Sequence, residues 1–106
     1  MKKAVWLSYD LGVRGDYTSL YEWLDNLDAK ECGDSIAFFK YEVNSGEVLK
    51  NKIKKDLSDN VTLEKRDRIY IMYLDSKKKM KGSFIFGRRK SSPWEGYGSK
   101  RVEIDE

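Results

Sequence analysis

The sequence predicts a two-layer α+β domain in which two helices cover one face of a mostly antiparallel sheet. Three observations lead to this prediction. Two segments with apolar residues at helical spacing alternate with strand-like apolar runs, in the order β-α-β-α-β. A Gly-Asp pair interrupts the middle strand run, and the last strand is followed by a turn and a returning strand. Because strand–helix–strand crossovers are right-handed, both helices are expected on the same face.

The first strand is expected over residues 3–10 and the first helix over residues 17–28. The strand has two alternating sets that are both largely apolar, which is typical of a central strand: Val5, Leu7 and Tyr9 on one side, Ala4, Trp6 and Ser8 on the other. Asp16 is a suitable N-cap for the helix. Apolar residues then follow the spacing of one helix face, at Tyr17, Leu20, Tyr21, Leu24 and Leu27.

Residues 29–43 are expected to be extended, and Gly33-Asp34 is expected to split them into two strands. The segment Asn44-Ser45-Gly46 ends this run. Ser45 is expected to cap a second helix over residues 46–57, whose apolar stripe comprises Leu49, Ile53 and Leu57.

The last part of the chain predicts a β-hairpin. Residues 61–64 are weakly extended, residues 68–74 are the clearest strand, a lysine-rich turn covers residues 75–82, and residues 82–87 return. One more short strand is expected over residues 102–104. This order is that of a ferredoxin-like sandwich with a C-terminal β-hairpin extension. We expect residues 1–87 to form this domain and residues 88–106 to form a basic, partly flexible extension.

Composition restricts the kinds of site that the chain can carry. A chain of 106 residues is expected to form one domain. The single Cys32 cannot form an internal disulfide, which predicts a cytoplasmic location without a disulfide partner, and we expect Cys32 to be buried as a small apolar side chain. Histidine is absent, so a Cys/His zinc site is excluded. No run approaches the ~20 apolar residues of a membrane span, so no membrane partner is expected.

Charge is distributed unevenly along the chain. Residues 1–76 carry 12 basic and 14 acidic groups, a balance of −2, whereas residues 77–101 carry nine basic groups against Glu95, a balance of +8. The last five residues carry three acids. Such a positive segment is typical of a protein with a polyanionic partner such as nucleic acid. A solvated hairpin tip followed by a basic tail explains the same pattern, and both interpretations stay open.

Several basic and aromatic residues are candidates for contact with nucleic acid. Arg14 lies in the glycine-bearing loop before the first helix, where backbone N–H groups can face phosphate, although a plain strand–helix connection explains that loop equally well. Since the hairpin places its turn lysines at the opposite end, a second group is expected near the start of the strand at residues 68–74: Lys65, Arg66, Arg68, Arg88, Arg89 and Lys90.

Trp94 follows that second group and is a candidate for stacking on unpaired bases, with Tyr97 nearby. The alternative is that charge protects the hairpin edge while Trp94 packs on the core or on a partner. Tyr70 and Tyr73 fall on opposite faces of one strand, which we interpret as sheet packing.

Four stretches within residues 3–75 resemble the small CRISPR-associated adaptation protein family (the "Cas-two" family) and its relatives, the VapD-type toxins: Ser8-Tyr9-Asp10-Leu11, residues 16–24, residues 29–38 and Asp67-Arg68-Ile69-Tyr70-Ile71. The resemblance implies a ferredoxin-like protomer that dimerises through its sheet. It also implies a metal-dependent nuclease with Asp10 near the dimer axis, although many members of the family are structural or bind nucleic acid. The chain departs from the family after Asp75.

Asp10, at the carboxyl end of the first strand, is the candidate catalytic residue. Two copies across a dimer axis would hold Mg²⁺ or Mn²⁺, which would polarise a phosphate and activate water. The alternative is that Asp10 caps the following turn by accepting from backbone N–H groups. The sequence thus predicts a homodimer that acts on nucleic acid, with metal-dependent endonuclease or endoribonuclease activity. The alternatives are a non-catalytic dimer that binds nucleic acid or protein, and a toxin or regulatory protein.

Overall fold

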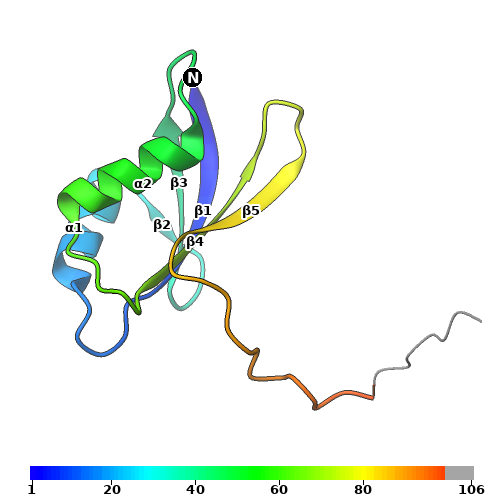
Figure 1. Ribbon diagram of the computed structural model, residues 1–106. Helices are drawn as coiled ribbons and strands as arrows, with labels where there is room; N and C mark the ends of the chain where they lie inside the picture. Colours follow the sequence, from blue (N-terminus) through cyan, green and yellow to red (C-terminus); the bar gives the residue numbers. More distant parts are fainter. Residues whose placement is uncertain (100–106) are drawn as a thin grey trace, which may run out of the picture.

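The structure, a computed structural model, describes residues 1–99 and has two helices and five strands (Figure 1). The elements are, in chain order, β1 (Lys2–Asp10), α1 (Tyr17–Asn26), β2 (Lys30–Glu31), β3 (Ile36–Glu42), α2 (Leu49–Asn60), β4 (Arg68–Leu74) and β5 (Met80–Phe86). The sheet has the order β2-β3-β1-β4-β5, and all neighbouring strands are antiparallel. The predicted ferredoxin-like α+β fold is confirmed. The strand expected over residues 102–104 lies outside the described residues.

Both helices pack on one face of the sheet, and the core lies between the two layers (Figure 1). Alternate strand residues meet the apolar stripes of the helices there, and the most completely buried of these side chains are Val5, Leu7, Leu20, Phe39, Ile53, Leu57, Ile69 and Ile71. Burying each such side chain contributes roughly 1.5–3 kcal/mol. The spacing of these residues therefore decides which face of the sheet the helices cover.

The other face of the sheet is open, since neither helix covers it (Figure 1). Side chains alternate along a strand, so the residues between the core positions point to this face. Although it is open, it carries mainly apolar and aromatic side chains, and those of β1, β3, β4 and β5 are half-buried: Ala4, Trp6, Ile36, Phe38, Tyr70, Met72 and Phe84. We call these residues the open face.

Two helix boundaries differ from the prediction. α1 ends at Asn26 rather than at residue 28, because Asp28 has a φ of 55°, in the left-handed region. α2 begins at Leu49 rather than at residue 46, and Ser45 does not cap it. Gly46 has a φ of 85°, so the chain makes a turn there before the helix can begin.

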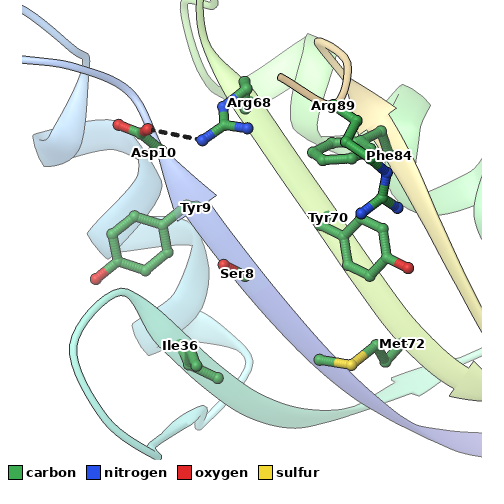
Figure 2. Close-up of a pocket in the computed structure, with 9 residues that line it drawn as sticks. All are labelled: Ser8, Tyr9, Asp10, Ile36, Arg68, Tyr70, Met72, Phe84 and Arg89. Atoms are coloured by element: carbon green, nitrogen blue, oxygen red, sulfur yellow. Dashed lines mark hydrogen bonds and ion pairs between the residues drawn. The ribbon is translucent and has the colours of Figure 1, made fainter. Parts of the chain in front are cut away.

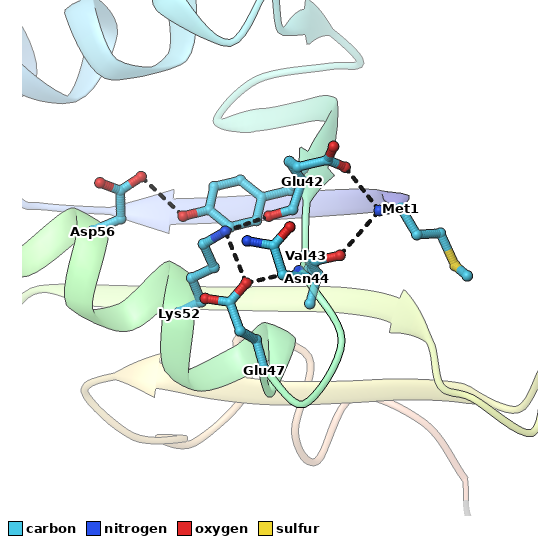
Figure 3. A network of polar contacts seen from close by, with 8 residues as sticks. Met1, Glu42, Val43, Asn44, Glu47, Lys52 and Asp56 are labelled. Carbon is cyan, nitrogen blue, oxygen red and sulfur yellow. Dashed lines mark hydrogen bonds and ion pairs between the residues drawn. The ribbon is translucent and has the colours of Figure 1, made fainter.

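Polar contacts join α2 to the preceding loop and to its neighbours in the core (Figure 3). The carboxylate of Glu47 accepts from the backbone N–H of Asn44 at 2.7 Å and pairs with Lys52 at 3.2 Å. Asp56 Oδ2 accepts from the Tyr41 hydroxyl at 2.9 Å and from Trp23 Nε1 at 3.0 Å. Burial is the main cause that raises the pKa of Tyr41, and the hydrogen bond to Asp56 raises it further. One carboxylate of α2 thus contacts both β3 and α1.

The middle and last strands follow the expected pattern with two corrections. The Gly33-Asp34 break does divide the extended segment into β2 and β3. β5 starts at Met80, two residues before the predicted strand, and residues 61–64 form no strand. Cys32 is exposed, so the expectation that it is buried was wrong; it lies at the break between β2 and β3, outside the core. Within residues 1–99, neither helix is long and apolar enough to cross a membrane.

Candidate functional site

A hollow of about 390 Å³ lies on the open face where β1 ends and β4 begins (Figure 2). Four strands and the segment after β5 contribute its lining, which consists of Ser8, Tyr9, Asp10, Ile36, Arg68, Tyr70, Met72, Phe84 and Arg89. The floor is apolar and aromatic, whereas the charged groups lie at the end of the sheet. The hollow therefore combines ring surfaces with one carboxylate and two guanidinium groups.

Tyr70 and Phe84 form the aromatic part of the hollow. They are opposite one another in the β4–β5 pair, with ring centroids 4.8 Å apart and an interplanar angle of 73°. The Tyr70 ring lies across Gly82 on the neighbouring strand, where an added Cβ would overlap the phenol oxygen. Gly82 therefore lets the tyrosine ring lie close to β5, an arrangement by which an aromatic side chain covers a strand glycine.

Two arginines lie over these rings. The guanidinium carbon of Arg89 is 5.5 Å from the centroid of Phe84 and 6.0 Å from that of Tyr70. That of Arg68 is 5.9 Å from Phe84. These distances are those of cation–π pairs. Gly87, with a φ of 73°, turns the chain after β5 in close contact with the backbone of Asp67, and this turn brings Arg89 to the start of β4.

Asp10 is paired with Arg68, its opposite residue in the β1–β4 ladder (Figure 2). Arg68 Nη2 donates to Asp10 Oδ2 at 3.3 Å, and the backbone N–H of Gly12 donates to Oδ1 at 3.4 Å. The hydrogen bond from Arg68 is the main cause that lowers the pKa of Asp10. The carboxylate thus contacts the following turn, as the capping interpretation expects, and remains 54 % exposed.

The metal site predicted from Asp10 depends on the ligands that surround this carboxylate. Within residues 1–99 there is no group of three or more Asp, Glu, Cys or His side chains placed to hold a metal ion. At this position one protomer offers the carboxylate of Asp10, which is paired with the guanidinium group of Arg68. Mg²⁺ binds through one or two carboxylates plus waters and phosphate oxygens. The Mg²⁺ or Mn²⁺ site therefore stays a prediction that needs a second copy of the chain.

A groove of about 470 Å³ continues from the hollow along the segment after β5. It shares Asp10, Arg68, Phe84 and Arg89 with the hollow and adds residues 90–94, so that Lys90 and Trp94 line it. Trp94 is 73 % exposed and does not pack in the core. Of the predicted nucleic-acid-binding residues, the structure thus brings together Arg68, Arg89, Lys90 and Trp94.

The remaining predicted residues lie outside the hollow and the groove. Lys65 lines a separate surface pocket beside Phe86 and Gly87. Arg66 lies next to Gly12, while Arg14 and Arg88 are exposed and line neither cavity. The lysine-rich turn follows β4 directly, at the other end of the hairpin from Arg89.

The sequence prediction missed the aromatic residues of the site. Tyr70 was interpreted as sheet packing, and Phe84 only as part of the returning strand. Their signal was the alternation of Arg68, Tyr70 and Met72 on one face of β4, combined with the hairpin register that places Phe84 opposite Tyr70. A second aromatic pair, Trp6 and Phe38, lies on the same face with ring centroids 4.9 Å apart. The signal becomes visible once the strand pairing is known.

Fold and site together define a ferredoxin-like α+β domain whose open sheet face carries aromatic rings and arginines. Comparison with protein-family models, with curated proteins and with solved structures finds no match to this chain. The resemblance to the "Cas-two" family and the VapD-type toxins stays a prediction from short motifs. The chemistry of the open face is therefore the basis for a functional proposal.

Proposed function

We propose that this protein binds single-stranded nucleic acid on its open face, with the Tyr70–Phe84 pair as the stacking position. The observation that carries the proposal is the half-buried aromatic pair with the guanidinium groups of Arg68 and Arg89 above it. Aromatic rings of this kind stack on bases of either RNA or DNA, at about 1–3 kcal/mol per base. The arginines lie beside these rings, where they can pair with the phosphates or the base edges of a bound strand.

Charge favours a polyanion as the partner. Arg68, Arg89 and Lys90 line the groove, and within residues 1–99 Asp10 is the only acid that lines it. A second copy packed face to face with its twofold axis at the groove would bring these cations against their equivalents, and such like-charge contacts disfavour association. A nucleic-acid strand neutralises the same groups and releases bound counterions. The open face therefore suits a nucleic acid better than a copy of itself.

The aromatic pairs favour a single strand over a duplex. Stacking on a side chain requires an unpaired base whose flat face is accessible, whereas a duplex covers these faces with neighbouring base pairs. Trp6 and Phe38 form a second pair, and Met72 is the register partner of Trp6 on β4. The two pairs thus lie on one continuous face, and a strand that crosses β5, β4, β1 and β3 would place two bases on them.

Fluorescence anisotropy with labelled eight-nucleotide strands tests this proposal. Wild type is expected to bind single-stranded RNA or DNA at low salt and to bind a hairpin duplex more weakly. Tyr70→Leu is expected to lose about 5- to 150-fold in affinity, which corresponds to one lost stack of 1–3 kcal/mol. Tyr21→Leu is the matched control, because Tyr21 is 51 % exposed on α1, on the other side of the sheet.

Three results bear on the alternatives. Equal losses in Tyr70→Leu and Tyr21→Leu would contradict the assignment of the stacking position. Absence of binding, together with a doubled solution mass that Phe84→Ser reduces to that of a monomer, would assign the open face to a second copy. Incubation of the same strands with Mg²⁺ or Mn²⁺, with EDTA as control, tests the nuclease prediction, which requires cleavage that Asp10→Asn abolishes.

A further inference from the structure

We infer that the base held at the Tyr70–Phe84 pair is a guanine, read by Asp10 and Arg68. This inference rests on the proposed function and assigns a base preference to the same site. The hollow has three components: a stacking surface, a carboxylate and a guanidinium group, all in its lining. Each component matches a different part of one base.

Guanine has hydrogen-bonding groups that match both the Asp10 carboxylate and the Arg68 guanidinium group. Its N1–H and N2 amino groups are adjacent donors, which suit the two oxygens of a carboxylate. Its O6 and N7 atoms are adjacent acceptors, and arginine donates to both in the commonest specific contact between protein and base. None of the other bases has two adjacent donors together with two adjacent acceptors. Cytosine comes nearest, since one amino group can donate to a carboxylate while N3 and O2 accept from arginine.

The Asp10–Arg68 pair keeps hydrogen-bonding groups that are available to a base. Arg68 has five N–H donors, and the structure shows one of them used by Asp10, at 3.3 Å. Among the described residues, Asp10 receives this bond and the 3.4 Å bond from Gly12, and its side chain is 54 % exposed. The two residues are held side by side by strand register, so they present an acceptor and a donor in one fixed order.

The position of Arg89 is consistent with the entry of a base. In the structure its guanidinium group lies over both rings, where a stacked base would lie. A guanine that enters the hollow takes this place on the rings and frees Arg89 for a neighbouring phosphate. The hollow, at about 390 Å³, falls in the range of about 300–1,000 Å³ that is common for small-ligand sites. The site can therefore take a whole base without a change in the backbone.

The test compares eight-nucleotide uridine strands that carry one central guanosine, inosine, 7-deazaguanosine, cytidine or no substitution. The guanosine strand is expected to bind about 5- to 150-fold more tightly than the all-uridine strand. Inosine lacks the N2 amino group and 7-deazaguanosine lacks N7, so each is expected to lose part of this advantage. Asp10→Asn is expected to abolish the difference between guanosine and inosine. Asp25→Asn, an exposed acid on α1, is the matched control and keeps that difference.

The outcomes separate the two proposals. Binding of all strands with equal affinity overturns the guanine inference and leaves the proposed function standing. Absence of binding to any strand overturns both. Tighter binding of cytidine than of guanosine also overturns the inference. Free GMP is included as a competitor: if it binds as tightly as the guanosine strand, the neighbouring nucleotides contribute nothing, which overturns the strand as the ligand and assigns the site to a mononucleotide. Circular dichroism of Asp10→Asn shows whether the variant is folded.

Discussion

Salt dependence separates the charge contribution of the groove from the stacking contribution of the rings. In the part of the chain that the structure describes, three cations line the groove: Arg68, Arg89 and Lys90. For a single strand, the slope of log K against log salt is about −0.7 per neutralised phosphate, so three contacts predict a slope of about −2. Between about 50 and 200 mM salt, wild type should lose about 18-fold in affinity.

Lys90→Gln removes one of these charges and leaves the Tyr70 and Phe84 rings unchanged. Its slope should fall to about −1.4, so that the loss over the same salt range is about 7-fold. Tyr70→Leu should behave differently, because stacking does not release counterions. Its affinity should fall by about 5- to 150-fold at every salt concentration, with the slope of wild type. The measurement is an anisotropy titration of the eight-nucleotide all-uridine strand, which offers Arg68 no guanine and leaves it to pair with phosphate, at four or more salt concentrations.

Lys50→Gln is the matched control for charge, since Lys50 lies on α2, on the covered side of the sheet. Its slope is expected to equal that of wild type. The reasoning is refuted if Lys90→Gln and Lys50→Gln reduce the slope equally, because the charge would then act through the net charge of the protein. It is also refuted if Tyr70→Leu changes the slope as much as Lys90→Gln does.

Three further predictions concern the fold and the site. Gly82→Ala should displace the Tyr70 ring and weaken strand binding as Tyr70→Leu does, whereas Gly98→Ala, which has open space around it, should bind as wild type in the same titration. Leu57→Ala, at a side chain with 0 % exposure, should lower the free energy of unfolding in urea by about 2–5 kcal/mol, and a loss below about 1 kcal/mol would contradict the described core. The pKa of Asp10 is lowered in the folded state, mainly by the hydrogen bond from Arg68, so the stability that this pair contributes is present above the unfolded-state pKa of about 3.9 and is lost as the pH falls through the folded-state pKa. The difference in urea unfolding between wild type and Asp10→Asn should therefore be constant near pH ~7 and shrink as the pH is lowered below about 4.

The fold could be predicted from the sequence because its signals are local. The helical spacing of Leu49, Ile53 and Leu57 and the alternation in β4 each specify an element and its buried face. The right-handed crossover rule then places both helices on one face of the sheet. The start of α2 could not be predicted in the same way, since Ser45 is a good cap by residue type. The left-handed conformation of Gly46 decides that the turn comes first.

The candidate site could be predicted only in part, because it depends on strand pairing. Arg68 and Arg89 were found as charges at one end of the hairpin, and Asp10 as an acid at a strand end. The ion pair between Asp10 and Arg68 results from the β1–β4 register, which joins residues 58 positions apart. The stacking pair likewise needs the β4–β5 register, and that register shifts between Ile69 and Tyr70. No periodicity within one segment contains this information.

The hairpin strand β5 connects the fold to the proposed function. A ferredoxin-like sheet needs β4 at its edge, and β5 adds a further strand there that packs Ile85 into the core. On the open face the same strand supplies Phe84 and the flat surface of Gly82, and its end positions Arg89. Large apolar surfaces that are left open on a small domain are typically interaction sites. Ending the chain before β5 would remove both Phe84 and Arg89. The β4–β5 hairpin and the binding of a nucleic-acid strand should therefore be lost together.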